Sequence, residues 1–267
     1  MSVDPQQPRK VLCVHGVQTG NDADQQQHKD IADLINSRMG NIPLTFETEM
    51  YRYENINDAA QKRYRQLLKL LVQTPAGGIV ADKAFDLVAD VVTAVADTST
   101  AAKIRAGLRA RILEIFEAGN PCYLVAHSLG TIYAFDVVNA LMREDGLFLR
   151  DSRRSWPLQG LVTLGSPIGL PMFSGAARKK VSRLGPGNKW FRWLNYWDRT
   201  DPVVSGNIFG KQLRSYDIAE KYQRPDPDQG WVIRDRAVDT GRLWLLAHTA
   251  YWTHPVVGDG LVDMITN

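Results

Sequence analysis

The chain has 267 residues, of which 44% are hydrophobic and 23% are charged, and its formal net charge at pH 7 is +3. A chain of this length can bury a sizeable core, and the composition is that of an ordinary globular protein. The small positive charge is too weak to indicate nucleic acid as a main partner. The sequence shows no apolar signal segment and no window of the roughly 20 apolar residues that a spanning helix needs. We therefore expect a cytoplasmic protein with no integral membrane segment.

Two cysteines, Cys13 and Cys122, each lie in a short apolar run that predicts a buried strand. Free cysteine is among the most buried residue types, so we expect both to be thiols packed in the core. Two thiols cannot form a disulfide-rich scaffold, and a reducing compartment suits them. A redox pair is the alternative interpretation.

Strand-like and helix-like segments alternate along the chain, and no internal repeat is present. This alternation favours an α/β fold with a mostly parallel central sheet and helices on both faces. Short apolar runs between turn residues predict strands over 10–15, 44–53, 121–127, 158–164, 190–197 and 231–239. Apolar periodicity and helix-boundary signals predict helices over 22–39, 129–142 and 256–265.

One stretch departs from this alternation. Residues 57–118 predict several consecutive helices without a strand between them, which form a helical insert of about 55–118. A Thr-Pro-Ala-Gly-Gly run at 74–78 predicts a hinge or loop within it. The insert is either a cap over a site, with 74–98 as a lid, or a set of helices that cover one face of the sheet. We expect the whole chain, 1–267, to be a single domain.

The strongest functional signal is the run Ala126-His127-Ser128-Leu129-Gly130, which follows an apolar strand and opens a helix. It resembles the nucleophile elbow of the α/β-hydrolase family, usually written G-x-S-x-G. In such an elbow a sharp turn strains the serine backbone, and small residues on both sides let strand and helix approach closely. The first glycine is replaced by Ala126 here, and alanine is still small. The alternative is an ordinary serine that caps a helix N-terminus.

The resemblance also implies an oxyanion hole made of two backbone N–H groups. The N–H of Leu129 lies at a helix N-terminus, where unpaired donors favour negative charge. In the family the second donor comes from the loop after an early strand, and the corresponding run here is His15-Gly16-Val17. The implied donor is the N–H of Val17, with Gly16 letting the substrate approach.

The family places an acid after the serine in chain order, at the end of a later strand. Asp201 fits this position, because it follows an aromatic-rich predicted strand and precedes Pro-Val, as in the acid loop of the family. The acid holds the base in the correct tautomer and stabilises its protonated form. Asp198 is the rival for this role, and its alternative role is to cap a turn.

Only two histidines, His248 and His254, follow the predicted acid. His248 begins a His-x-x-Tyr-Trp segment that resembles the C-terminal segment of many lipase-like relatives, and we therefore favour it as the base. His254 precedes a proline and is expected to lie in a loop or at the entry of a helix. The other three histidines are expected to be structural or at the surface: His15, His127 and His28.

The resemblance covers about residues 10–265 and implies an α/β-hydrolase fold with Ser128, Asp201 and His248 as a catalytic triad. The implied activity is that of a lipase-like serine esterase, which cleaves a carboxylic ester of a small molecule or lipid through an acyl-enzyme. No metal or organic cofactor is implied. An acyltransferase or a thioesterase would use the same three residues. A catalytically inactive scaffold or binding module of the same fold is a further alternative.

Overall fold

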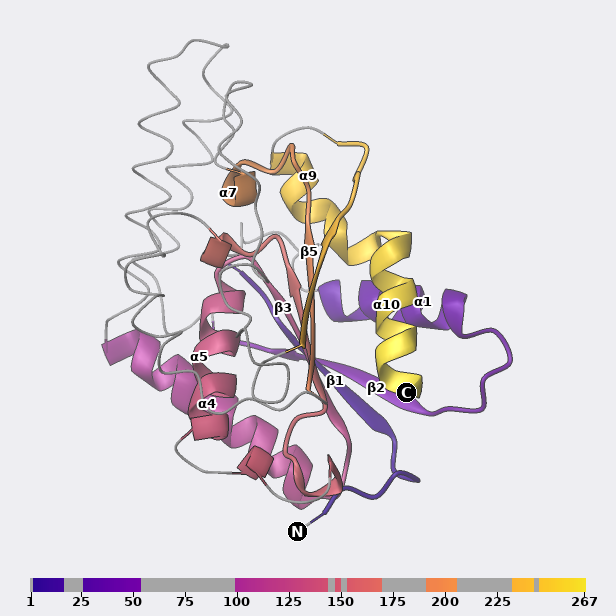
Figure 1. The fold of residues 1–267 in the computed structure, drawn as a ribbon, viewed down its shortest axis with the longest axis vertical. Coiled ribbons are helices and arrows are strands. Elements are labelled where there is room, and N and C mark those ends of the chain that lie inside the picture. Colours follow the sequence, from indigo (N-terminus) through magenta and orange to yellow (C-terminus); the bar gives the residue numbers. More distant parts are fainter. Residues whose placement is uncertain are drawn as a thin grey trace.

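Six parallel strands form the centre of the molecule (Figure 1). The structure is a computed structural model, and it describes residues 2–16, 26–53, 99–143, 147–149, 153–169, 191–205, 232–242 and 245–267. The strands are β1 (Arg9–Val14), β2 (Phe46–Tyr51), β3 (Cys122–His127), β4 (Gly160–Leu164), β5 (Arg192–Trp197) and β6 (Val232–Ala237). They pair in the order β2-β1-β3-β4-β5-β6, and each neighbouring pair is parallel. The predicted α/β fold with a parallel central sheet is confirmed.

Helices cover both faces of this sheet, as predicted (Figure 1). The helices α4 (Ser99–Glu117) and α5 (Gly130–Arg143) lie on one face. The helices α1 (Gln27–Met39) and α10 (Pro255–Thr266) lie on the other. The shorter helices are η3 (Leu147–Leu149), η4 (Arg153–Ser155), η5 (Pro167–Gly169), α7 (Pro202–Ser205), α9 (Leu245–Thr249) and η6 (Ala250–Thr253).

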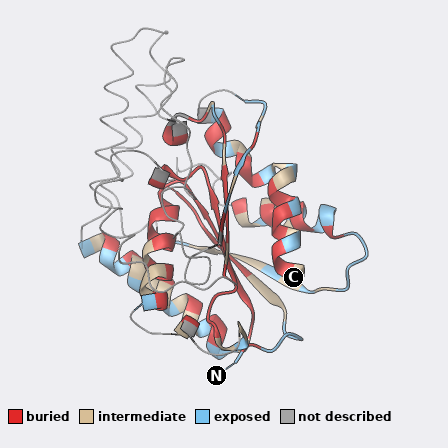
Figure 2. Cartoon of the chain, viewed as in Figure 1, coloured by how far each residue is buried: buried red, intermediate tan, exposed pale blue. Residues whose placement is uncertain are grey.

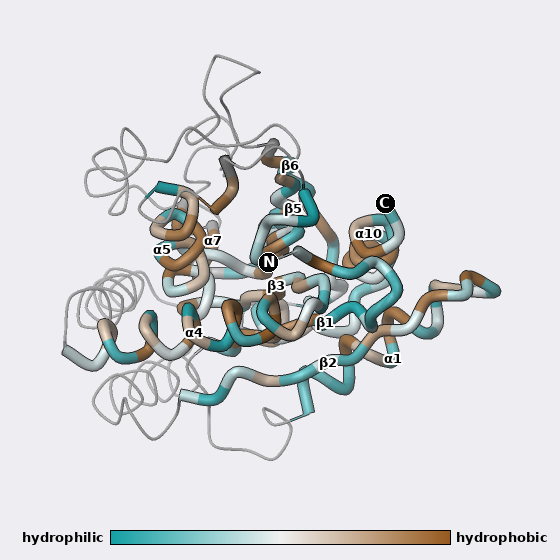
Figure 3. The backbone as a smooth tube through the Cα atoms, turned by 90° about the horizontal axis from the view of Figure 1, so that it is seen from below, coloured by the Kyte–Doolittle hydropathy of each residue, from teal (hydrophilic) through white to brown (hydrophobic). Residues whose placement is uncertain are grey.

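The central strands β3 and β4 are mostly apolar because helices bury both of their faces. Every residue of β3 and β4 is buried (Figure 2). Successive side chains of β3 point to opposite faces, so Leu124 packs in the cluster under α4 and α5 while Val125 packs in the cluster under α1 and α10. Hydrophobic residues are concentrated along α10 (Figure 3). Trp193 lies fully buried in this core, which agrees with a packing role.

Several predicted boundaries differ from the observed ones. The strand predicted over 44–53 spans only Phe46–Tyr51, because β2 is an edge strand and its ladder ends where its single partner β1 ends. The helix predicted over 22–39 is described from Gln27 onward, and 22–25 lie outside the described residues. His28, which was expected at the surface, lies on α1 and is half-buried.

The predicted helical insert is described only at its C-terminal end, where α4 forms a helix of 19 residues. Residues 54–98, which include the predicted lid at 74–98, lie outside the described residues. Both cysteines, Cys13 and Cys122, are buried free thiols as predicted, and burial raises the pKa of each. In the described part of the chain, no helix is both long and apolar enough to cross a membrane.

Candidate active site

The turn between β3 and α5 places Ser128 in a strained backbone conformation. Its φ is 53°, and among the described residues it is the one non-glycine residue with a positive φ. The Cβ atom makes this left-handed region unfavourable by roughly 1–2 kcal/mol for most residues. The N–H of Ser128 donates to the carbonyl oxygen of Leu164 at 2.9 Å, which ties the turn to the end of β4. A strained residue at the carboxyl end of a central strand is typical of functional sites.

Two glycines allow other parts of the backbone to approach this turn. A Cβ atom on Gly130 would collide with the carbonyl oxygens of Val14 and His15 at the end of β1. A Cβ atom on Gly16 would lie 2.6 Å from the Cβ of Ser128. The segment that follows β1 therefore passes directly against the serine, as the predicted oxyanion loop would require.

Of the two predicted oxyanion donors, Leu129 and Val17, the described residues include only Leu129. Leu129 is buried at the start of α5, and the N–H groups of Thr131 and Ile132 donate back to the carbonyl oxygens of Ser128 and Leu129. The N–H of Leu129 therefore lies ahead of the hydrogen-bonded turns of α5, at the positive end of the helix dipole. Val17 lies outside the described residues, and its role stays a prediction.

Tyr53, just after β2, holds the segment that leads to Val17. Its hydroxyl donates to the carbonyl oxygens of His15 at 2.6 Å and Gly16 at 3.1 Å. Its ring stacks on the ring of His15 with centroids 4.2 Å apart, and the rings of Tyr51 and Tyr133 also lie beside it. This contact could not be predicted from the sequence, because Tyr53 and His15 are far apart in the chain.

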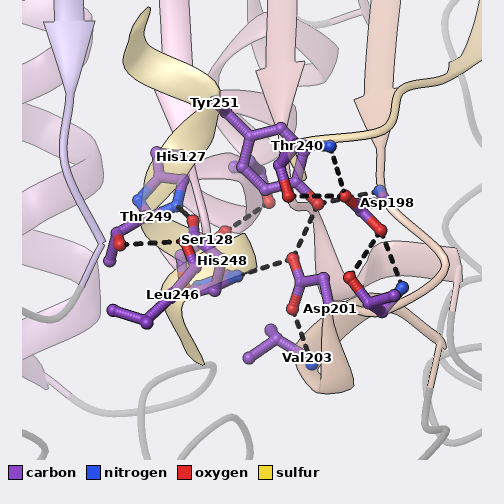
Figure 4. A network of polar contacts seen from close by, with 12 residues as sticks. His127, Ser128, Asp198, Asp201, Val203, Thr240, Leu246, His248, Thr249 and Tyr251 are labelled. Carbon is purple, nitrogen blue, oxygen red and sulfur yellow. Dashed lines mark hydrogen bonds and ion pairs between the residues drawn. The ribbon is translucent and has the colours of Figure 1, made fainter. Parts of the chain in front are cut away.

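Asp201 and His248 form a buried hydrogen-bonded pair (Figure 4). The Nδ1 of His248, on α9, lies 2.8 Å from Oδ2 of Asp201, which lies at the entry of α7 after β5. The side chains are 1% and 0% exposed, respectively. A carboxylate can only accept, so Nδ1 donates and Nε2 carries the lone pair. Nε2 is buried and has no hydrogen-bond partner among the described residues.

The serine and this pair lie in one neighbourhood at the carboxyl end of the sheet (Figure 4). Ser128 is hydrogen-bonded to Leu164, and the next residue, Gly165, contacts the pair. A Cβ atom on Gly165 would lie 3.0 Å from both Oδ2 of Asp201 and Nδ1 of His248. Its φ of 54° also favours glycine, so Gly165 leaves the space that the pair occupies.

Asp198, the rival acid, is engaged in a turn instead. Its Oδ1 accepts from the N–H and hydroxyl of Thr200 at 2.7 Å each. Its Oδ2 accepts from the N–H of Thr240 at 2.8 Å and from its hydroxyl at 2.7 Å. Burial alone would raise the pKa of Asp198, but these hydrogen bonds outweigh it and lower the pKa. The structure thus brings Asp201, and not Asp198, to His248.

His127 connects the elbow to the helix that carries His248. Its Nε2 lies 2.7 Å from the carbonyl oxygen of His248, and since a carbonyl can only accept, Nε2 is the donor. The two rings are 4.6 Å apart. Burial, followed by repulsion from His248, keeps the pKa of His127 well below its ordinary value, so its ring stays neutral. The expectation that His127 is a structural residue agrees with this environment.

His254 lies at the start of α10, as expected from its proline neighbour. Its Nδ1 accepts from the N–H of Val256 at 3.2 Å and its Nε2 contacts the carbonyl oxygen of Asp239 at 3.1 Å. It is the N-cap of that helix. His254 is thereby occupied as a cap, whereas His248 has the hydrogen-bonding environment of a base.

Comparisons with known proteins add little to this geometry. No family model and no curated protein matches the chain. One solved structure to which the chain is similar is an IroE-like serine hydrolase from Shewanella oneidensis, with a TM-score of 0.48 and 13% sequence identity. The match covers 97% of this chain and 69% of that one. The strand order and helix layers described above are those of an α/β fold with a parallel central sheet, and a fold does not by itself define a function.

Proposed function

We propose that the protein is a serine hydrolase that cleaves a carboxylic ester through an acyl-enzyme intermediate on Ser128. The observation that carries this proposal is the buried Asp201–His248 pair, 2.8 Å apart, beside a serine held at a φ of 53°. A scaffold protein has no need for a strained serine next to a buried histidine whose Nε2 lone pair is unused. This arrangement therefore favours a nucleophile, a base and an orienting acid.

In the proposed mechanism, His248 Nε2 takes the proton from the Ser128 hydroxyl while Oγ forms a bond to the ester carbonyl carbon. The carbonyl oxygen becomes an oxyanion, which the N–H groups of Leu129 and Val17 stabilise. The C–O bond to the alcohol then breaks, and His248 gives its proton to the departing oxygen. Water repeats the sequence on the acyl-enzyme and releases the acid. Asp201 keeps Nδ1 protonated throughout and stabilises the imidazolium.

An apolar acyl ester or a lipid is the substrate class that we favour. Leu246, on the same helix as His248, is 65% exposed, which is unusual for a large hydrophobic residue so close to a polar site. Figure 4 shows it beside the polar network. Contact with an apolar substrate group would bury this side chain and contribute binding energy.

Pre-steady-state kinetics with a p-nitrophenyl ester tests the proposal. An acyl-enzyme that forms faster than it breaks down gives a burst of p-nitrophenol equal to the concentration of protein, followed by slower turnover. Varying the acyl group from acetyl to octanoyl tests the apolar preference. A folded protein that produces neither burst nor turnover with any of these esters would argue for a binding module instead.

The acid can be assigned by comparing two substitutions. We expect Asp201→Asn to lower kcat/KM about 10³- to 10⁴-fold, because an amide cannot hold His248 in the productive tautomer. Asp198→Asn should instead lower the melting temperature, because four donors from Thr200 and Thr240 meet its carboxylate. Ester hydrolysis and thermal unfolding of both variants check this. A large loss of activity in Asp198→Asn with little effect in Asp201→Asn would reverse the assignment.

A further inference from the structure

Tyr251, three residues after His248, is part of the same buried network (Figure 4). It lies in η6, the turn that directly follows α9, and its side chain is fully buried. A separation of three residues in consecutive helical turns places both side chains on one face, toward Asp201. Its hydroxyl donates to Oδ2 of Asp201 at 2.8 Å. This is the same carboxylate oxygen that accepts from His248.

The same hydroxyl also accepts a hydrogen bond from the N–H of Asp198 at 2.9 Å. A phenol has one proton, so accepting from Asp198 commits that proton to Asp201. On the other side, the N–H of Val203 donates to Oδ1 of Asp201 at 2.9 Å. Both oxygens of the acid are thus fixed by groups other than the base. Burial, followed by the charge of Asp201, raises the pKa of Tyr251 well above its ordinary value, so it remains a donor.

We propose that Tyr251 is a positioning residue. It orients the Asp201 carboxylate and weakens the electrostatic interaction between that carboxylate and His248. The inference rests on the proposed triad. Charge on Oδ2 that is drawn toward the tyrosine proton stabilises the imidazolium form of His248 less. A base whose protonated form is too stable is occupied by a proton at neutral pH and cannot accept one from serine. The hydroxyl therefore holds the Asp201 carboxylate in place for His248 and shares the Oδ2 atom that accepts from Nδ1.

Packing alone does not account for the hydroxyl. The ring of Tyr251 belongs to the hydrophobic cluster under α1 and α10, and phenylalanine would fill the same space. Tyr196, on β5, provides a matched comparison. It is equally buried in the same cluster, but its hydroxyl has no hydrogen-bond partner among the described residues and packs against Gly260. A tyrosine in this core can therefore be present without a polar role, whereas the hydroxyl of Tyr251 bridges two segments.

The test compares Tyr251→Phe with Tyr196→Phe, two substitutions that each remove one buried hydroxyl. The titration of the His248 ring is followed by NMR in protein labelled with ¹⁵N-histidine, and His248→Gln assigns the resonance. Among the described residues, the titratable groups next to this ring are Asp201, His127 and Tyr251, and Asp198 lies one hydrogen bond further away. This measurement requires no substrate, so it is independent of whether the ester activity is found.

In Tyr251→Phe we expect the titration midpoint of His248 to move to higher pH by about half a unit or more, because Asp201 loses a donor. We expect kcat for an ester to fall about tenfold with KM nearly unchanged, and the acidic limb of the kcat profile to move in the same direction. Tyr196→Phe should change neither midpoint nor profile. A lower melting temperature is also expected in Tyr251→Phe, because a positioning role and a purely structural role of the hydroxyl both predict it. The titration midpoint of His248 therefore decides between these two roles.

An unchanged midpoint in Tyr251→Phe, or an equal change in both variants, would overturn the positioning role. The proposed function fails separately, if unmodified protein shows no burst and no turnover while the midpoint of Tyr251→Phe still moves. A third variant, Tyr251→Leu, removes the ring as well. If it resembles Tyr251→Phe in the titration but unfolds at a much lower temperature, the electrostatic and packing contributions are separated.

Discussion

Replacing Ser128 with Ala should reduce ester hydrolysis by on the order of 10⁴-fold or more while the protein unfolds at nearly the same temperature. Alanine removes only Oγ and leaves the backbone of the elbow as strained as before. The measurement is turnover of a p-nitrophenyl ester together with thermal unfolding of the same preparation. Substantial activity in a folded Ser128→Ala protein would refute the nucleophile.

The variant Ser128→Gly separates the loss of the catalytic hydroxyl from the relief of backbone strain. Ser128 has a φ of 53°, which glycine adopts without a Cβ penalty. We expect Ser128→Gly to be as inactive as Ser128→Ala but more stable by up to about 1 kcal/mol, since it relieves the strain of the left-handed region. A glycine variant that is less stable than the alanine variant would show that the turn stores no strain.

Replacing His248 with Ala should also remove on the order of 10⁴-fold or more of the activity, because the proposed mechanism makes His248 the base that takes the serine proton. His254→Ala is the matched control. His254 caps α10, so its loss should cost about 1 kcal/mol of stability and leave turnover close to that of the unmodified protein. The loss of activity is therefore expected in His248→Ala, and the loss of stability from the missing cap is expected in His254→Ala. A His254→Ala protein that is folded but inactive would move the base to that residue.

The sheet could be predicted from the sequence because its central strands are buried on both faces. Runs such as 121–127 are continuously apolar, and turn residues mark their ends. The ends of the edge strand β2 could not be predicted in the same way. Its length is set by its ladder with β1, from Arg9 paired with Phe46 to Val14 paired with Tyr51, and this pairing is a tertiary property.

The elbow could be found from sequence because its requirements are local. A strand, a serine and a small residue on each side have to follow one another within a few positions, as they do at Ser128. The choice between Asp201 and Asp198 could not be made locally, since both follow the same strand. It depends on which carboxylate reaches His248, and the turn formed with Thr200 and Thr240 occupies Asp198.

The residues that support the candidate site could not be predicted from the sequence, because their roles depend on contacts between distant segments. Tyr53 and Tyr251 act through hydroxyl contacts to segments that are distant in the chain, and their types carry no signal of this. Gly165 directly follows the strand predicted over 158–164, and only its positive φ and its contact with Asp201 give it a place in the site. Only the spacing of three residues between His248 and Tyr251 could have suggested that they share a face.

The most direct test of the central claim is covalent labelling of the purified protein with a fluorophosphonate probe, followed by mass mapping of the labelled peptide. Such probes react with a serine that an adjacent base activates, and an ordinary helix-capping serine is inert to them. We expect one adduct per chain, on Ser128, which disappears in Ser128→Ala and forms far more slowly in His248→Ala. A folded protein that is not labelled, or that is labelled at another serine, would contradict the central claim.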